Sequence, residues 1–297
     1  MRPTIPQLET LLAVARTRNF RHAADEVHAT QPALSAQVRK LEAILGVQLF
    51  ERDRRHVILT EAGQRTAEVA ARLLADLDEL VAVAKGCGDP MHGELRLGVI
   101  PTVAPHLLPL ACPALRKAFP RLQLLVREDT TQALLRQLRD GALDLLLLAV
   151  DVPLGQVETQ VLFADTFLLA MPRGHALARK KSLHLTDLAG EQVLLLDEGH
   201  CLAQQTQELC RKAGPYTVGD FRATSLSTLV QMVAAGLGVT LLPELALGDF
   251  QKLRDLEVRP FAAPAPARRI GLAWRPSSAR GACFRALGRV IEASVPG

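Results

Sequence analysis

The stretch RHAADEVHATQPALSAQVRKLEAIL, residues 21–45, decides the fold of the first part of the chain. It predicts a short helix over residues 21–28, a turn at 29–30 and a second helix over 31–45. The second helix has a favourable start, because Thr30 can accept hydrogen bonds from first-turn N–H groups and Pro32 stands where a missing N–H costs little. Apolar side chains then recur on one helical face, at Leu34, Val38, Leu41 and Leu45. Two helices joined by so short a turn indicate a helix-turn-helix.

The polar side chains of residues 31–45 lie off this apolar face. A helix of this kind can place its N-terminal polar side chains against base edges in the major groove of double-stranded DNA, while neighbouring groups hold phosphates. The side chains that we expect to contact DNA from this helix are Gln31, Pro32, Ala33, Ser35, Gln37 and Arg39.

Residues 50–59 predict a β-wing after the second helix. Arg52, Arg54 and Arg55 stand near its tip, and clustered arginines there suit contacts with the DNA backbone. Nine Lys and Arg and six Asp and Glu lie in residues 1–60, so +3 of the chain's net charge of +4 sits in its first fifth. An anionic partner is therefore expected at this end of the molecule.

Residues 60–85 predict one long helix, which Thr60 can cap and Gly86 can end. Its apolar stripe consists of Ala62, Thr66, Val69, Leu73, Leu77, Leu80 and Ala84. We expect this stripe to pair with a second copy of the chain; the alternative is that it packs on its own domain. Residues 86–93 have the composition of a hinge.

From residue 94 onward, strand and helix patterns alternate. Strands are expected at 95–100, 122–127 and 143–150, with helices at 104–118 and 132–140 between them, which predicts a parallel sheet covered by helices. A second α/β unit follows, with strands near 166–171, 193–196, 219–223 and 239–242, and a late strand at 270–275 can return to the first unit. Two such halves predict a cleft between them.

The N-terminal pattern as a whole resembles the winged helix-turn-helix of LysR-type transcription regulators. The matching residues are Ala23, Ala24, 31–35, Leu41, Glu42, Leu45, Gly46, Leu49, Phe50, Arg52 and 59–63. The resemblance implies an α/β protein with a linker helix and a two-lobed, periplasmic-binding-protein-like effector domain. The expected boundaries are 1–59 for the DNA-binding domain, 60–93 for the linker and 94–297 for the effector domain, with lobe I at 94–165 plus 270–297 and lobe II at 166–269. It also implies RNA polymerase as a partner and a dimer through the linker helix within a homotetramer.

Two cysteines, Cys201 and Cys210, stand in one segment that predicts a helix. A thiolate at a helix N-terminus, where Cys201 is expected, is stabilised by the helix dipole. On one continuous helix, nine residues separate the two Cα atoms by about 13 Å, whereas a disulfide needs about 7 Å or less. A bond between them would therefore require the segment to be remodelled. Two buried structural thiols are one alternative, and a metal site that lacks a fourth ligand is another.

The arrangement Gly199-His200-Cys201 followed by Cys210 resembles the peroxide-sensing members of the LysR-type regulators. The resemblance implies that hydrogen peroxide oxidises Cys201 to a sulfenic acid and that Cys210 resolves it to a disulfide. It further implies a peroxide pocket made by four residues: Thr102, Thr131, His200 and Arg268. Residues 129–130, beside Thr131, depart from the common form of that pattern.

Two rival interpretations stay open. One keeps the DNA-binding role but replaces peroxide with a small molecule in the interlobe cleft, which makes the cysteines incidental, as Cys87, Cys112 and Cys283 are expected to be. The other is a binding or catalytic protein unrelated to DNA, although the sequence contains no catalytic triad, metal motif or nucleotide-binding loop. We therefore expect no enzyme activity, cofactor or metal. The sequence has no secretory signal, and its densest apolar run, residues 145–150, is far short of a membrane span, so a cytoplasmic location is expected.

Overall fold

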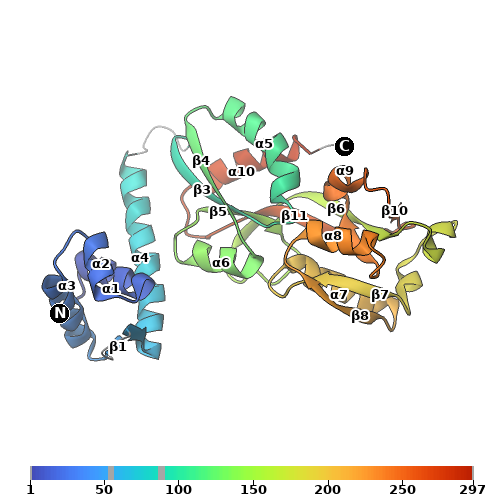
Figure 1. Ribbon diagram of the computed structural model, residues 1–297. Helices are drawn as coiled ribbons and strands as arrows, with labels where there is room; N and C mark the ends of the chain where they lie inside the picture. Colours follow the sequence, from blue (N-terminus) through green and yellow to red (C-terminus); the bar gives the residue numbers. More distant parts are fainter. Residues whose placement is uncertain (1, 53–56, 86–90, 296–297) are drawn as a thin grey trace. The chain divides into compact units, whose positions relative to one another are not determined.

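The computed structural model describes residues 2–52, 57–85 and 91–295. Its contacts divide the chain near residue 87 into an N-terminal and a C-terminal unit, which are described separately (Figure 1). In the described part of the chain, none of the helices combines the length and apolar composition that a membrane span requires.

The N-terminal unit is a small helical domain with a two-stranded wing. Its elements are α1 (Ile5–Thr17), α2 (Phe20–Glu26), α3 (Gln31–Leu45), β1 (Phe50–Arg52), β2 (Val57–Leu59) and α4 (Glu61–Lys85). Three of the four side chains predicted to form one apolar face of α3, those of Leu34, Val38 and Leu41, are fully buried in the core of this unit. The fourth, Leu45, is 37% exposed, because it is the last residue of the helix and lies beyond this core. The two wing strands pair antiparallel, from Phe50 opposite Leu59 to Arg52 opposite Val57.

Helix α2 begins and ends earlier than the predicted 21–28. Its start is set by Asn19, whose Oδ1 accepts hydrogen bonds from Arg21 N and His22 N at 2.9 and 3.2 Å. Its end is set by His28, which has a left-handed φ of 52° that no helix continues. Thr30 caps α3 as expected, through a hydrogen bond from Ala33 N to its Oγ1.

The linker helix α4 is capped by Thr60, as predicted. Thr60 Oγ1 accepts a hydrogen bond from Gly63 N at 2.9 Å and donates one to Gln48 O at 2.7 Å. Gly63 packs so tightly that a Cβ there would lie 2.0 Å from Leu49 O. Further along, Ala70 is buried against the domain core. The cap and this contact fix the first half of α4 to the rest of the N-terminal unit.

The C-terminal unit is built on a seven-stranded sheet with the order β10-β6-β11-β5-β3-β4, to which β9 adds by pairing with β6. Its strands are β3 (Gly93–Val99), β4 (Leu122–Glu128), β5 (Leu145–Ala149), β6 (Glu158–Pro172), β9 (Thr240–Pro243), β10 (Leu256–Pro260) and β11 (Ala267–Trp274). Strands β3, β4 and β5 are parallel, as predicted, whereas β11 runs antiparallel to both β5 and β6. A separate parallel pair joins β7 (Gln192–Leu196) to β8 (Thr217–Ala223).

Helices pack against this sheet and alternate with its strands along the chain. They are α5 (Ala104–Ala118), α6 (Thr131–Arg139), α7 (Cys201–Ala213), α8 (Leu226–Ala234), α9 (Leu247–Phe250) and α10 (Gly281–Glu292), with short 3-10 helices η1 (Ala176–Arg179), η2 (Leu185–Leu188) and η3 (Glu244–Ala246). Helices α5 and α10 pack against each other, and α7 packs beside β7 (Figure 1).

The unit has two lobes, because its buried apolar residues form two separate cores. Strand β6 serves both cores, with Leu162 in the first and Phe167 in the second. The strand predicted at 166–171 is therefore only the second half of a longer strand. The late strand begins at Ala267, earlier than the predicted 270, because its pairing with β6 continues beyond a register shift between Ile270 and Gly271 as far as Thr166. Strand β10 was not predicted at all.

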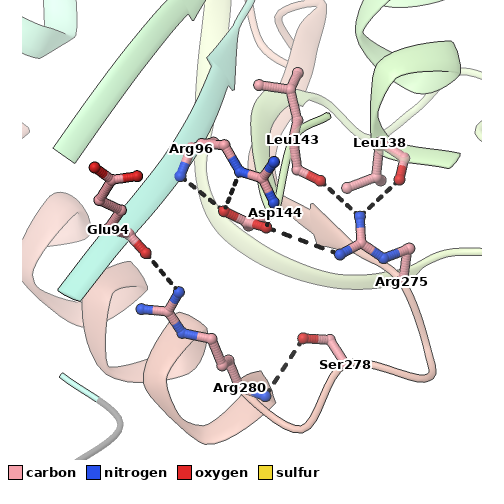
Figure 2. A network of polar contacts seen from close by, with 8 residues as sticks. All are labelled: Glu94, Arg96, Leu138, Leu143, Asp144, Arg275, Ser278 and Arg280. Atoms are coloured by element: carbon pink, nitrogen blue, oxygen red, sulfur yellow. Dashed lines mark hydrogen bonds and ion pairs between the residues drawn. The ribbon is translucent and has the colours of Figure 1, made fainter. Parts of the chain in front are cut away.

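An arginine and carboxylate network holds the base of the first lobe together (Figure 2). Asp144 accepts hydrogen bonds from Arg96 N, Nε and Nη2 at 2.9, 3.1 and 2.8 Å. Arg275, just after β11, donates from Nη1 to the carbonyls of Leu138 and Leu143 at 2.7 and 2.6 Å. These bonds tie the end of α6 and the residues before β5 to the middle of β3 and to the end of β11.

Candidate functional site

The segment between β7 and α7 presents the first candidate cysteine. Gly199 adopts a left-handed φ of 101°, which turns the chain into α7. His200 is the N-cap residue and Cys201 is the first residue of the helix, as the sequence predicted. The Cys201 side chain is buried, with 6% of its residue surface exposed, and it belongs to the core of the first lobe. Its thiol thus lies at the positive end of the α7 dipole.

A small pocket opens in front of this thiol. It is lined by Ile100, Pro101, Thr102, Thr131, His200 and Cys201. Three of the four predicted pocket residues therefore line it together with Cys201, although Thr102, Thr131 and His200 are far apart in the sequence. Thr131 Oγ1 is buried and, among the described residues, has no hydrogen-bond partner. An unpaired buried hydroxyl in the wall of a pocket is a group that can bind a small polar molecule there.

The fourth predicted residue, Arg268, lies behind Thr102 and is not among the residues that line the pocket. Its side chain is completely buried. Arg268 Nη1 donates to Thr102 Oγ1 at 2.8 Å, and Nη2 donates to Thr102 O at 3.2 Å. Because Thr102 Oγ1 accepts the bond from the guanidinium, its own hydroxyl hydrogen remains available to another acceptor. The arginine therefore acts on the pocket through the threonine.

The electrostatic state of His200 follows from its surroundings. Burial lowers the pKa of His200 below its ordinary value, and the nearby Asp197 carboxylate raises it by less. The imidazole is therefore neutral near pH 7 and can offer a hydrogen bond to the pocket, but no charge. The sequence had left both roles open for this side chain.

Cys210 lies in a different environment from Cys201, although both are on α7. It is fully buried in the core of the second lobe, and burial raises the pKa of its thiol to about 11. Since α7 is one continuous helix, the two cysteines stand about 13 Å apart along its axis. All four described cysteines, Cys112, Cys201, Cys210 and Cys283, are free thiols.

Sequence reasoning missed Gln205, which stands one helical turn after Cys201. This side chain is 7% exposed, and neither Nε2 nor Oε1 has a hydrogen-bond partner in the described structure. A buried amide without partners is costly, so it marks a place where a polar molecule or a rearranged backbone could satisfy it. The spacing of four residues from Cys201 was the available signal.

The remaining predicted residues belong to the N-terminal unit. On α3, Gln31, Pro32, Ala33 and Arg39 are exposed, and Ser35 and Gln37 are half-buried. Arg52 ends β1, while Arg54, Arg55 and Cys87 lie outside the described residues. No group of three or more His, Cys, Asp and Glu within the described ranges could hold a metal ion.

Comparison with known proteins identifies both units. Residues 5–64 match the bacterial regulatory helix-turn-helix of the lysR family, and residues 88–295 match the LysR substrate-binding domain. The chain belongs to the LysR family. It is therefore a DNA-binding transcription regulator of the LysR type, not an enzyme, and the predicted winged helix-turn-helix and two-lobed α/β domain are confirmed.

Individual LysR-family relatives are similar over almost the full length. The Escherichia coli K12 protein described as DNA-binding transcriptional dual regulator OxyR is 42% identical over 294 residues, which cover 99% of this chain and 96% of that protein. A full-length OxyR variant from Pseudomonas aeruginosa superposes with a TM-score of 0.79 at 33% identity, covering 98% of this chain and 95% of that one. A Corynebacterium glutamicum OxyR mutant with hydrogen peroxide bound has a TM-score of 0.66 at 35% identity, covering 99% and 94%.

Proposed function

We propose that this LysR-type regulator senses hydrogen peroxide through Cys201 and signals by forming a disulfide with Cys210. The observation that carries the proposal is the pocket in front of Cys201, where a threonine hydroxyl backed by a buried guanidinium faces a thiol at a helix N-terminus. Several relatives that are 42–44% identical are described as hydrogen peroxide-inducible genes activators, which supports the choice of signal.

The first step is a two-electron oxidation of Cys201. The thiolate sulfur attacks one oxygen of hydrogen peroxide, the O–O bond breaks, and an S–O bond forms to give the sulfenic acid. The second oxygen leaves as hydroxide with the electrons of the broken bond and takes up a proton to become water. Thr102 stabilises this leaving oxygen with its hydroxyl hydrogen, while Thr131 and His200, which also line the pocket, supply further hydrogen bonds around the peroxide.

The second step joins the two cysteines. The sulfur of Cys210 attacks the sulfur of the Cys201 sulfenic acid, the S–O bond breaks, and water leaves as the disulfide forms. Because about 13 Å of helix separates the two residues, α7 must unwind before their sulfurs can meet. The oxidised effector domain therefore differs in shape from the reduced one around α7.

The output of the switch is the arrangement of reader domains on DNA. The oxidised form must bind one arrangement of DNA half-sites more favourably than the reduced form does, and a change in that arrangement alters contact with RNA polymerase. We assign residues 1–59 to the reader, 60–93 to the linker and 94–297 to the effector domain, with lobes at 94–165 plus 270–297 and at 166–269. We place the regulator in the cytoplasm, where reduced thiols are the resting state.

The oligomer is proposed from two exposed apolar surfaces. On α4, Val69, Leu73 and Leu80 are 46, 52 and 63% exposed, which suits pairing with α4 of a second copy. In the C-terminal unit, the edge strand β4 exposes Leu125 and Val126, which gives a second self-association surface. Two kinds of interface support a homotetramer made from dimers.

The experiment that tests the redox proposal treats the reduced full-length protein with a slight excess of hydrogen peroxide and maps its cysteines by mass spectrometry. We expect a Cys201–Cys210 disulfide and faster oxidation of Cys201 than of Cys112, a half-buried thiol that serves as an internal control. A Cys201→Ser variant should lose the peroxide-dependent change in its DNA footprint. If no crosslink forms and the two thiols react equally fast, a small-molecule effector with incidental cysteines becomes the better interpretation.

The experiment that tests the oligomer uses sedimentation of Leu73→Glu, which should weaken dimerisation. Arg72→Glu, a change at the neighbouring exposed residue that lies outside the apolar stripe of α4, should not. Equal oligomeric states for both variants would refute pairing through this stripe.

A further inference from the structure

We propose that Asp165 is a positioning residue for the peroxide reaction, and that its carboxylate orients the Arg268 guanidinium toward Thr102. This inference rests on the proposed function and adds to it a residue that does not touch the pocket. Asp165 lies on β6, directly opposite Arg268 on β11 in the antiparallel register.

Both oxygens of this carboxylate have defined partners. Asp165 Oδ2 accepts a hydrogen bond from Arg268 Nε at 2.9 Å and lies 2.9 Å from Arg268 Nη2. Asp165 Oδ1 accepts a hydrogen bond from Leu245 N at 3.0 Å. The side chains of Asp165 and Arg268 are 2% and 0% exposed, so water does not compete for these bonds. The carboxylate is therefore fixed by a backbone N–H as well as by its ion pair.

The planar geometry of the guanidinium turns this fixed carboxylate into an orienting device. Asp165 holds the edge formed by Nε and Nη2, which leaves Nη1 directed at Thr102 Oγ1 and Nη2 close to Thr102 O. The fork of an arginine has a rigid shape, so fixing one edge fixes the other. Without the carboxylate, the guanidinium would lose the counter-ion that it has among the described residues, together with the contact that sets its rotation about the side chain.

The contact with Thr102 is where this orientation acts on the chemistry. In the proposed step, charge develops on the leaving oxygen, and a preorganised donor aimed at that position accelerates the reaction. A guanidinium held on Thr102 Oγ1 makes this hydroxyl a stronger donor, because hydrogen bonds in a chain polarise one another. Asp165 is thus placed to change the rate of peroxide reduction while contacting neither the peroxide nor the sulfur.

The location of Asp165 also connects the pocket to the junction of the two lobes. On β6 it stands between Leu162, in the first core, and Phe167, in the second. Its partner Leu245 N belongs to η3, which follows directly on β9 of the second lobe. The orientation of Arg268 therefore depends on the position of η3 relative to β6 and β11.

The test compares Asp165→Asn with Asp151→Asn in the full-length reduced protein. Asp151 is a matched control, since it pairs with the neighbouring Arg269 but at an exposed position. Two rates are measured for Cys201: oxidation by hydrogen peroxide and alkylation by iodoacetamide, which involves no leaving oxygen. We expect Asp165→Asn to slow the peroxide reaction by roughly tenfold or more and to leave alkylation nearly unchanged, because one donor to a developing oxyanion accounts for about 10²–10³ in rate. Asp151→Asn should alter neither rate.

A second variant keeps the proposal testable if Asp165→Asn does not fold. Asp165→Glu preserves the buried ion pair but displaces the guanidinium by one methylene, so it should slow the peroxide reaction selectively as well. Combining it with Thr102→Val should cause no loss beyond that of Thr102→Val alone, since both changes act on one hydroxyl. Additive losses would show that Asp165 does not work through Thr102.

The outcomes separate this inference from the function on which it rests. If Cys201 of the unaltered chain reacts with peroxide no faster than Cys112, the proposed function itself fails. If the unaltered chain is fast and Asp165→Glu is equally fast, only the role of Asp165 is refuted. A parallel fall in both the peroxide and alkylation rates would refute it too, because that pattern reports a general distortion of the pocket.

Discussion

Replacing Gln204 by glycine should speed disulfide formation without changing the first oxidation of Cys201. Gln204 is an exposed residue of α7 between the two cysteines, and its Nε2 donates a hydrogen bond to Glu208 Oε1 at 3.2 Å. Because the cysteines stand about 13 Å apart on an intact helix, closure of the disulfide requires α7 to unwind first. A change that weakens the helix therefore raises the population of the conformation that can react.

The magnitude follows from helix propensity. Glycine in an exposed helix interior is about 0.8–1.0 kcal/mol less favourable than alanine, which corresponds to roughly a fivefold change in the unwinding equilibrium. Gln204→Ala is the matched control, since it removes the same contact with Glu208 but keeps a strong helix former. We therefore expect Gln204→Gly to close the disulfide about five times faster than Gln204→Ala.

The assay mixes each reduced variant with one equivalent of hydrogen peroxide, quenches the reaction at intervals, and counts the sulfenic acid and disulfide forms by mass spectrometry. The rate at which the sulfenic acid appears should be equal in the two variants. Equal rates of disulfide closure would refute the reasoning, because they would mean that unwinding of α7 does not limit the encounter of the sulfurs.

Three further predictions concern the stability of the fold and its binding to DNA. Burial raises the pKa of Cys210 from 9.0 to about 11, so the folded state holds the thiol proton more tightly than the unfolded state does. The contribution of this proton to the free energy of unfolding is fully present below pH 9 and is lost as the pH rises toward 11. Reduced wild-type protein should lose about 1 kcal/mol relative to Cys210→Ala between pH 8 and pH 10 in urea unfolding, and parallel pH profiles would contradict the assigned burial. Arg275→Ala should destabilise the first lobe by about 2–3 kcal/mol, because it leaves the buried carbonyls of Leu138 and Leu143 without their donor. The fluorescence of Trp274, the only tryptophan in the sequence, reports this unfolding. An unshifted midpoint of the urea transition would refute the role of the network. Gly63→Ala should abolish DNA binding, because its Cβ would lie 2.0 Å from Leu49 O and would push the start of α4 away from the N-terminal domain. A gel-shift titration measures the affinity for DNA. Wild-type affinity would show that the start of α4 can shift at little cost.

Much of the fold could be predicted from local patterns. The caps at Thr30 and Thr60 and the turn before Cys201 are short-range features, so the starts of α3, α4 and α7 were placed correctly. Strand β6 was predicted as a shorter element because its first half has no strong alternation and is set by pairing with β11. That partner lies about a hundred residues away, and such pairing leaves little trace in a local window.

The candidate site shows the same division. The two cysteines and His200 could be found from their own segment, but the positions of Thr102 and Arg268 came only from a family resemblance. The bond between these two residues joins positions 166 apart in the sequence, and Asp165 is brought to Arg268 across 103. The burial that makes Gln205 and Asp165 informative is created by the assembled lobes, and no local pattern encodes it.

The division of α7 between two cores has a consequence for the return of the sensor to its resting state. Cys201 packs in the first lobe and Cys210 in the second, so the reduced helix is stabilised by both. Every contact that the disulfide disrupts is regained on reduction, which raises the reduction potential of the proposed disulfide by about 30 mV for each 1.4 kcal/mol of packing. The packing that delays oxidation therefore also makes the oxidised protein an easy substrate for cellular thiols, and the duration of the signal is set by the same helix that detects it.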